Sequence, residues 1–360
     1  MAQPSIVSEA ASSAPLAPVE MLVAAPNLTP EEIRAPAHLD FVHSPDNLLE
    51  EIQTRQARGA IVLGSPASAL SGSPSIIANF THPILEQGFD LAIGRYSEGR
   101  FDGLINKALV YPLTRALYGL QIHYPSALDF SFSSKLADVL TVNAPGSTPL
   151  RGPFLSAAVA AGLRICEVNP GFAREAPKEA RDLSSLLADA LGPLFADMER
   201  NASLWQRSRA SQPVPQFGAA VELIEPEQPS DVDISKLVDA FARGYKDLFE
   251  VWAQVLSPRT LLDLKKLARL APTDFRFPDE SWTRLVYEFA LGHRQRLMSR
   301  EHLLRSLTPL YLAWVASYAL EVHEASSDVV DRRLERLCLT FEAGKPYLVS
   351  RWRWPDRFNP

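Results

Sequence analysis

The sequence has little of what marks several protein classes, beginning with cysteine. It holds two cysteines in 360 residues, Cys166 and Cys338, with no Cys-x-x-Cys pair and no Cys/His spacing typical of zinc sites. We therefore expect two buried free thiols rather than a disulfide framework, which fits a reducing compartment. A chain of this length buries a core large enough to fold without cross-links.

Long apolar runs and an excess of basic residues are also missing. No run approaches the roughly 18 apolar residues of a membrane-spanning helix, and the first residues lack the basic start and apolar stretch of a secretory signal. Lys and Arg number 36 against 42 Asp and Glu, which gives a net charge of −6. A mildly acidic chain is a poor candidate for nucleic-acid or anionic-membrane binding. The sequence predicts a soluble, cytoplasmic protein with no nucleic-acid partner and no membrane span.

Common catalytic signatures are missing as well. The chain has no GxGxxG, GxxxxGK[ST], HExxH or GxSxG motif. Its seven histidines are scattered, and we expect each to be a surface residue or a satisfied core residue. One acid stands out, because Asp129 lies within the apolar sequence Leu-Asp-Phe-Ser-Phe. This pattern predicts either an edge-strand residue or a site acid aimed into a cleft.

Composition and the spacing of apolar residues divide the chain into three parts. Residues 1–19 are rich in Ala, Ser and Pro and predict a disordered tail. In residues 20–180, short apolar runs alternate with helical segments, which indicates an α/β domain with a mostly parallel sheet. Residues 181–360 show only helical periodicity, apart from a proline-rich linker predicted near 210–230. The expected strands are Met21–Ala25, Leu39–Val42, Ala60–Leu63, Phe89–Ile93 and Leu163–Val168.

Prolines and terminal patterns give further local predictions. Pro112 and Pro309 fall inside helical patterns, so we expect a kink or break at each. Asp231-Val232-Asp233 reads best as an acid pair at a helix N-terminus. The C-terminal Arg351-Trp352-Arg353-Trp354 alternates cations with aromatic rings. We expect this segment to pack on the helical portion; the alternative is phosphate or base binding.

The segment from Arg95 to Ala137 carries the most specific pattern in the chain. It contains VYPLTRALYG (residues 110–119) and ends in YPSALDFSFSSKLA. The segment resembles a group of bacterial, family 2-like glycosyltransferases with the GT-A fold, similar to glucosyl-3-phosphoglycerate and mannosylglycerate synthases. The resemblance continues through AAGLRICEVNPG and ADMERNASLW and returns at residues 275–322, so it covers most of residues 60–350.

The resemblance implies a fold and a chemistry. The fold would be a Rossmann-like, mostly parallel sheet that binds a nucleotide sugar across the carboxyl ends of its strands. In the family, a DxD motif holds a divalent cation that bridges the diphosphate, and the sugar moves to an acceptor hydroxyl. Asp129 matches the acid of the family segment PIGGDFGFS, so the resemblance implies a role for Asp129 in orienting the acceptor or as a base.

Several family motifs are altered in this chain. The DxD position is occupied by Ala67, Ser68 and Ala69, which offer no carboxylate to a cation, so we expect no metal cofactor. The two glycines before Asp129 are replaced by residues with side chains, and the nucleotide-sugar domain is shortened near its N-terminus. The acid of the family segment GTDIW aligns with Arg151, and the His of KIHD aligns with Arg174.

Three hypotheses follow from this mixture. The first is a pseudo-glycosyltransferase that has lost catalysis or kept it only weakly, and that binds a nucleotide sugar or regulates an active relative or a second copy of itself. The second is an active, metal-independent glycosyltransferase in which arginines replace the charge of the cation. The third is a structural protein that interacts through its helical half. The arginines expected to contact the diphosphate are Arg95, Arg100, Arg151 and Arg174.

Overall fold

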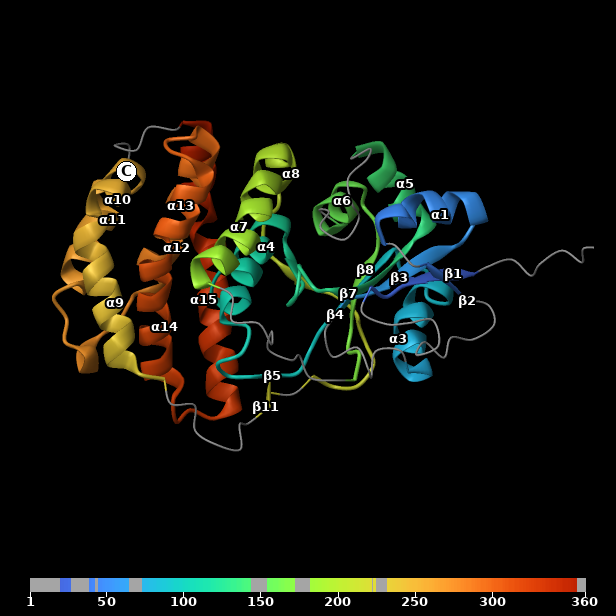
Figure 1. Cartoon of the computed structure of the whole chain (residues 1–360), viewed down its shortest axis with the longest axis horizontal. Helices are drawn as coiled ribbons and strands as arrows, with labels where there is room; N and C mark the ends of the chain where they lie inside the picture. Colours follow the sequence, from blue (N-terminus) through green and yellow to red (C-terminus); the bar gives the residue numbers. More distant parts are fainter. Residues whose placement is uncertain are drawn as a thin grey trace, which may run out of the picture.

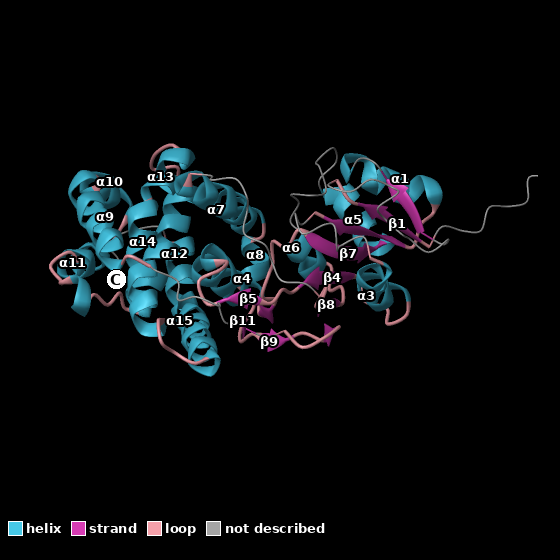
Figure 2. Cartoon of the chain, turned by 60° about the horizontal axis from the view of Figure 1, so that its bottom comes forward, coloured by secondary structure: helices cyan, strands magenta, loops and turns pink. Residues whose placement is uncertain are grey.

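The computed structural model describes residues 20–26, 39–42, 45–64, 73–143, 154–171, 182–221, 223–224 and 232–354. Within these residues the chain is an α/β protein with a mostly parallel sheet of seven strands. The strands gather at one end of the molecule, and the helices from α9 to α15 gather at the other (Figures 1 and 2).

The main sheet has the strand order β10-β8-β4-β7-β3-β1-β2. Strand β7 runs antiparallel to both of its neighbours, β3 and β4, and the other pairs are parallel. Strands β1, β3 and β4 are apolar and buried on both faces, as expected where helices cover both sides of a sheet. The strands are β1 (Met21–Ala24), β2 (Leu39–Val42), β3 (Gly59–Leu63), β4 (Leu91–Gly94), β7 (Asp129–Ser133), β8 (Ile165–Val168) and β10 (Gln216–Phe217).

Helices cover the two faces of this sheet unequally (Figure 1). Helix α3 (Pro74–Leu85) packs on one face, where Phe80 and Ile77 meet alternate residues of β1 and β3. The other face is covered by α1 (Leu48–Arg55), α5 (Ser134–Asn143) and α6 (Phe154–Ala160). The short helix η1 (Pro45–Asn47) leads directly into α1. The core on this second face continues without interruption into the helical part of the chain.

The helical part is organised around α15, which packs against α4 and α12, while α9 packs against α14. Asp233 caps the N-terminus of α9 by accepting a hydrogen bond from the backbone N–H of Lys236, which confirms the predicted role of this acid. The elements are η2 (Asn106–Val110), α4 (Tyr111–Tyr118), α7 (Leu183–Arg200), α8 (Ala202–Trp205), α9 (Ile234–Asp247), α10 (Phe249–Val255), α11 (Pro258–Leu267), η4 (Pro272–Asp274), α12 (Asp279–Gln295), α13 (Arg300–Ser306), α14 (Thr308–Val322) and α15 (Ser327–Arg353).

The two prolines expected to kink or break a helix behave differently. Pro112 causes no break, because the helical backbone continues from the π-helix η2 directly into α4, and the wider π turn immediately precedes the proline. Pro309 lies in the first turn of α14, which follows α13 after a break at Leu307.

Elements on each side of the boundary predicted at residue 180 pack with elements on the other side. Helix α4 precedes this boundary but packs on α15, near the end of the chain. Residues 212–217 were predicted as part of a linker, yet β10 pairs with β8 and extends the main sheet. Two small parallel sheets also form across the boundary: β5 (Glu98–Gly99) with β11 (Leu223–Ile224), and β6 (Leu120–Gln121) with β9 (Gln212–Pro213).

Candidate functional site

Buried polar side chains lie together at one end of the central strands of the main sheet, called here the carboxyl edge. The carboxyl ends of β4 and β8 meet the amino end of the antiparallel strand β7 at this edge. Tyr96, Asp129, Glu167 and Asn169 lie there, and all four are buried. The carboxyl edge of a parallel sheet is where open α/β proteins bind ligands, so this is the candidate site.

Asp129 lies at the start of β7 and is fully buried. Its carboxylate Oδ2 accepts a hydrogen bond of 2.6 Å from the hydroxyl of Tyr96, which follows β4. Because β7 is in the middle of the sheet, the edge-strand interpretation of Asp129 is wrong. The structure places this acid at the carboxyl edge of the sheet, where its carboxylate accepts a hydrogen bond from a hydroxyl of the protein.

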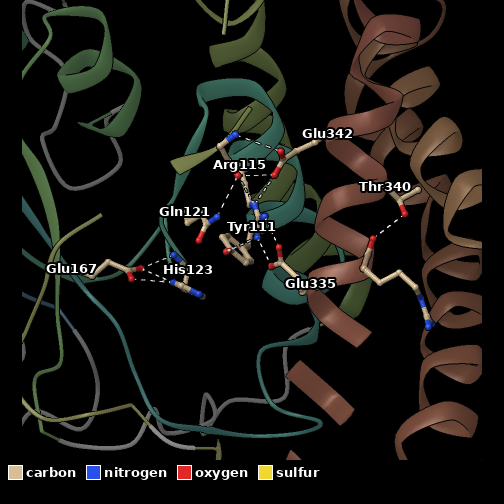
Figure 3. A network of polar contacts seen from close by, with 10 residues as sticks. Tyr111, Arg115, Gln121, His123, Glu167, Glu335, Thr340 and Glu342 are labelled. Carbon is tan, nitrogen blue, oxygen red and sulfur yellow. Dashed lines mark hydrogen bonds and ion pairs between the residues drawn. The ribbon is translucent and has the colours of Figure 1, made fainter. Parts of the chain in front are cut away.

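Glu167 is the centre of the site, and the sequence analysis missed it. Its buried carboxylate accepts hydrogen bonds from the backbone N–H of His123 at 2.5 Å and from Nε2 of Gln216 at 3.5 Å. The Nδ1 atom of His123 lies 3.0 Å from the same carboxylate, and the guanidinium of Arg95 lies 3.6 Å from it. Figure 3 shows Glu167 and His123 facing each other. The only local signal was an acid within an apolar strand, the pattern that singled out Asp129.

A second polar cluster adjoins the first and reaches the helices (Figure 3). The ring of His123 stacks on Tyr111 with centroids 4.8 Å apart, and the Tyr111 hydroxyl contacts Arg115 at 3.3 Å. Arg115 is buried and forms a two-pronged ion pair with Glu335 of α15, at 2.6 and 2.7 Å. Its Nε atom donates to Glu342 at 2.7 Å. This chain of contacts links β8 to α15.

Arg115 favours the ionised form of Glu335 in the second cluster. Hydrogen bonding to Arg115 lowers the pKa of Glu335 below its usual value. Ser211 adds a neutral donor, because its hydroxyl lies 2.7 Å from the Glu342 carboxylate. The cluster is therefore an internal ion-pair network.

The two predicted arginines that the structure describes, Arg95 and Arg100, do not converge on this edge. Arg95 follows β4, keeps a partly exposed side chain and lies beside Glu167. Arg100 instead donates to the backbone carbonyls of Val322, His323 and Ala325, where it caps the C-terminus of α14. The other positions singled out by the resemblance lie outside the described residues: Ala67, Ser68, Ala69, Arg151 and Arg174.

The described acids near this edge contact other groups of the protein. Among the residues that the structure describes, no group of three or more His, Cys, Asp or Glu side chains is arranged to hold a metal ion. Nearby, the buried carboxylate of Glu98 lies 3.3 Å from the ammonium of Lys107. The acids of this region are thus held by hydroxyl, amide and cationic groups of the protein.

Three other features singled out in the sequence have plain structural roles. Cys166 and Cys338 are buried free thiols, as predicted, and burial raises the pKa of Cys338 to about 12. Trp352 packs edge-to-face on Trp205 with centroids 5.0 Å apart, as expected for a packing role. Trp354, two residues on, is 71% exposed.

Neither the search for membrane-spanning helices nor the comparison with known proteins assigns an activity to this chain. Over the described part of the chain, no helix has the length and apolar character needed to span a membrane. No known protein family matches the sequence, and no curated protein matches it either.

Proposed function

We propose that this protein is a glycosyltransferase-like scaffold of the GT-A type that binds a nucleotide or nucleotide sugar and does not transfer the sugar efficiently. Its role would be binding or regulation, in association with a second copy or with an active relative. The proposal rests on the resemblance carried by VYPLTRALYG, and a mostly parallel, seven-stranded sheet is compatible with it. Polar groups at the carboxyl edge of that sheet provide a place for the ligand.

The burial of Asp129 and its hydrogen bond with Tyr96 are the observation that supports a loss of catalysis. A general base must reach the proton that it abstracts, and an acid that orients an acceptor must be open to it. Asp129 is instead fully buried, with the Tyr96 hydroxyl 2.6 Å from its carboxylate. Its carboxylate is better placed to hold β4 and β7 together than to contact an acceptor.

The cation that the resemblance implies does not fit the donors of this chain. Hard divalent cations take several oxygen ligands, and carboxylates are the usual ones. Ala67, Ser68 and Ala69 supply no carboxylate, and the described acids at the edge, Asp129 and Glu167, are engaged with Tyr96 and His123. A transfer reaction in this chain would therefore need another source of positive charge.

Arg95 favours a second candidate, the metal-independent enzyme. Its side chain is 22% exposed at the carboxyl edge, so a bound diphosphate could recruit the guanidinium away from Glu167. Arg100 does not support this candidate, because its guanidinium is committed to carbonyls at the end of α14.

Thermal-shift binding separates these proposals. UDP, GDP, UDP-glucose and GDP-mannose are titrated with and without Mg²⁺ or Mn²⁺. A ligand at about 100 times its Kd stabilises a protein by about 2.7 kcal/mol, so we expect a clear rise in Tm for at least one nucleotide without metal. No shift with any of them contradicts the proposal. Sugar transfer from a stabilising donor in the absence of metal, measured in a separate turnover assay, selects the metal-independent enzyme.

Two arginine variants test whether the nucleotide binds at the carboxyl edge of the sheet. Arg95→Ala is expected to abolish the nucleotide-dependent rise in Tm, because it removes the partly exposed cation at the carboxyl edge. Arg58→Ala is the matched control, since Arg58 immediately precedes β3 and so lies at the opposite edge of the sheet. Equal losses in both variants would place the nucleotide elsewhere.

A further inference from the structure

A groove of about 460 Å³ lies in the helical part, between α12 and α15 with α11 at its rim. It is on the far side of α15 from the ion-pair network. Figure 3 shows Thr340, a lining residue, on the side of α15 away from Glu335 and Glu342. The groove is therefore distinct from the site at the edge of the sheet.

Close packing of α15 on α12 shapes the bottom of the groove. A Cβ atom at Gly344 would lie 3.0 Å from Cγ2 of Thr283 and 3.3 Å from Cε2 of Tyr287. Glycine thus allows the two helices to approach, and Tyr287, Ala343 and Tyr347 give the groove a mostly apolar lining. An apolar or aromatic group of a ligand fits such a lining.

The charged residues of the groove are mostly cationic. Its lining includes three arginines, Arg259, Arg284 and Arg336, against one acid, Glu280. Arg336 pairs with Glu321 at 2.8 Å, whereas neither Arg259 nor Arg284 forms an ion pair with any residue that the structure describes. Unneutralised guanidiniums beside an apolar lining favour an anionic group on the ligand.

A cation–π contact supports a ligand of this kind. The guanidinium of Arg284 lies over the ring of Tyr347, 4.5 Å from its centroid, which holds the cation beside the apolar lining.

From these observations we propose that the groove binds a small amphipathic anion, with a flat apolar body on the tyrosines and a carboxylate or phosphate on the arginines. The anionic group contacts Arg284 and Arg259, and the apolar body lies over Ala343 and Gly344. This site is independent of nucleotide binding at the sheet.

Calorimetric titration of the full chain tests the proposal with four probes. They are 1-naphthyl phosphate, 2-naphthoate, inorganic phosphate and 1-naphthol. We expect at least one of the two aromatic anions to bind at least about tenfold more tightly than both partial probes, because each of these lacks one half of the recognised chemistry. The preference between the aromatic anions distinguishes a phosphate from a carboxylate ligand. The proposal is overturned if neither aromatic anion binds, or if inorganic phosphate binds as tightly as the better of them.

Three variants locate the binding. Arg284→Ala removes the half-buried cation and is expected to weaken the better aromatic anion by about tenfold or more. Ala343→Trp fills the groove from an exposed position without changing the charge, and is expected to abolish binding. Arg332→Ala is the matched control, because Arg332 is exposed on the same helix but does not line the groove. Unchanged binding in the first two variants, or equal weakening in the control, overturns the assignment.

Discussion

Replacing Arg115 with alanine is expected to lower the free energy of unfolding by about 3 kcal/mol, the low end of the usual cost of removing one partner from a buried ion pair, because Glu342 is mostly buried but Glu335 is half exposed. Arg115 is 2% exposed and binds Glu335 through both terminal nitrogens, at 2.6 and 2.7 Å. Its Nε atom holds Glu342 at 2.7 Å. Without the guanidinium, two carboxylates of α15 face α4 with no cation between them. Urea denaturation at neutral pH measures the change.

Two further variants show whether this cost belongs to the buried network. Arg115→Lys keeps the charge but loses the planar fork, so we expect an intermediate destabilisation. Arg305→Ala removes an exposed partner of Glu301 on α13, and its effect is expected to stay below about 1 kcal/mol. If Arg115→Ala costs no more than Arg305→Ala, the network does not hold α4 against α15.

The same network predicts a pH dependence. Bonding to Arg115 lowers the pKa of Glu335 in the folded protein below its unfolded value. The resulting stabilisation is present above the unfolded pKa, near 4.5, and is lost as the pH falls through the lower folded pKa. Wild type and Arg115→Ala should therefore converge in stability as the pH falls below about 4.5. A difference in stability that does not shrink on acidification would contradict this role for Glu335.

Local patterns in the sequence were sufficient for most elements of the fold. Apolar runs between turn residues predicted β1, β2, β3, β4 and β8, and helical periodicity predicted α9, α10, α12, α13, α14 and α15. The exceptions depend on distant partners. Strand β10 has two residues in a proline-rich stretch, and only its pairing with β8 makes it a strand. Helix α4 lies between β4 and β7 in sequence, but it packs against α15.

The candidate site was less predictable for the same reason. Asp129 could be found because an acid inside an apolar run is visible locally. The role of Glu167 depends on His123, 44 residues earlier, and the role of Arg115 depends on Glu335, 220 residues later. A local sequence pattern does not show which residues that far apart in the sequence are in contact in the fold. The arginines show the converse error: Arg100 was grouped with Arg95 by type and position, but the fold uses it to cap a helix.

Truncating Trp282 to alanine is expected to cost about 3–5 kcal/mol, the range for large aromatic residues in a core. The side chain is fully buried on α12 and packs against Trp314 and Phe277, with ring centroids 6.1 and 5.6 Å away. Trp354→Ala is the matched control, since that tryptophan is 71% exposed, and its effect should stay within about 0.5 kcal/mol. Equal effects of the two truncations in urea denaturation would show that the aromatic cluster around Trp282 adds little stability.

The position of Trp282 also predicts how the loss spreads. Its indole N–H donates to the backbone carbonyl of Ala108 at 3.0 Å, which ties α12 to the π-helix η2. Since η2 leads into α4 and the same core reaches the sheet, Trp282→Ala should speed hydrogen exchange in β4 and β7 as well as in α12. Trp282→Phe keeps much of the apolar contact but leaves that carbonyl without its donor, so its cost should be intermediate. Faster exchange confined to α12 and its neighbouring helices would mean that the helices and the sheet unfold separately, although their core is continuous.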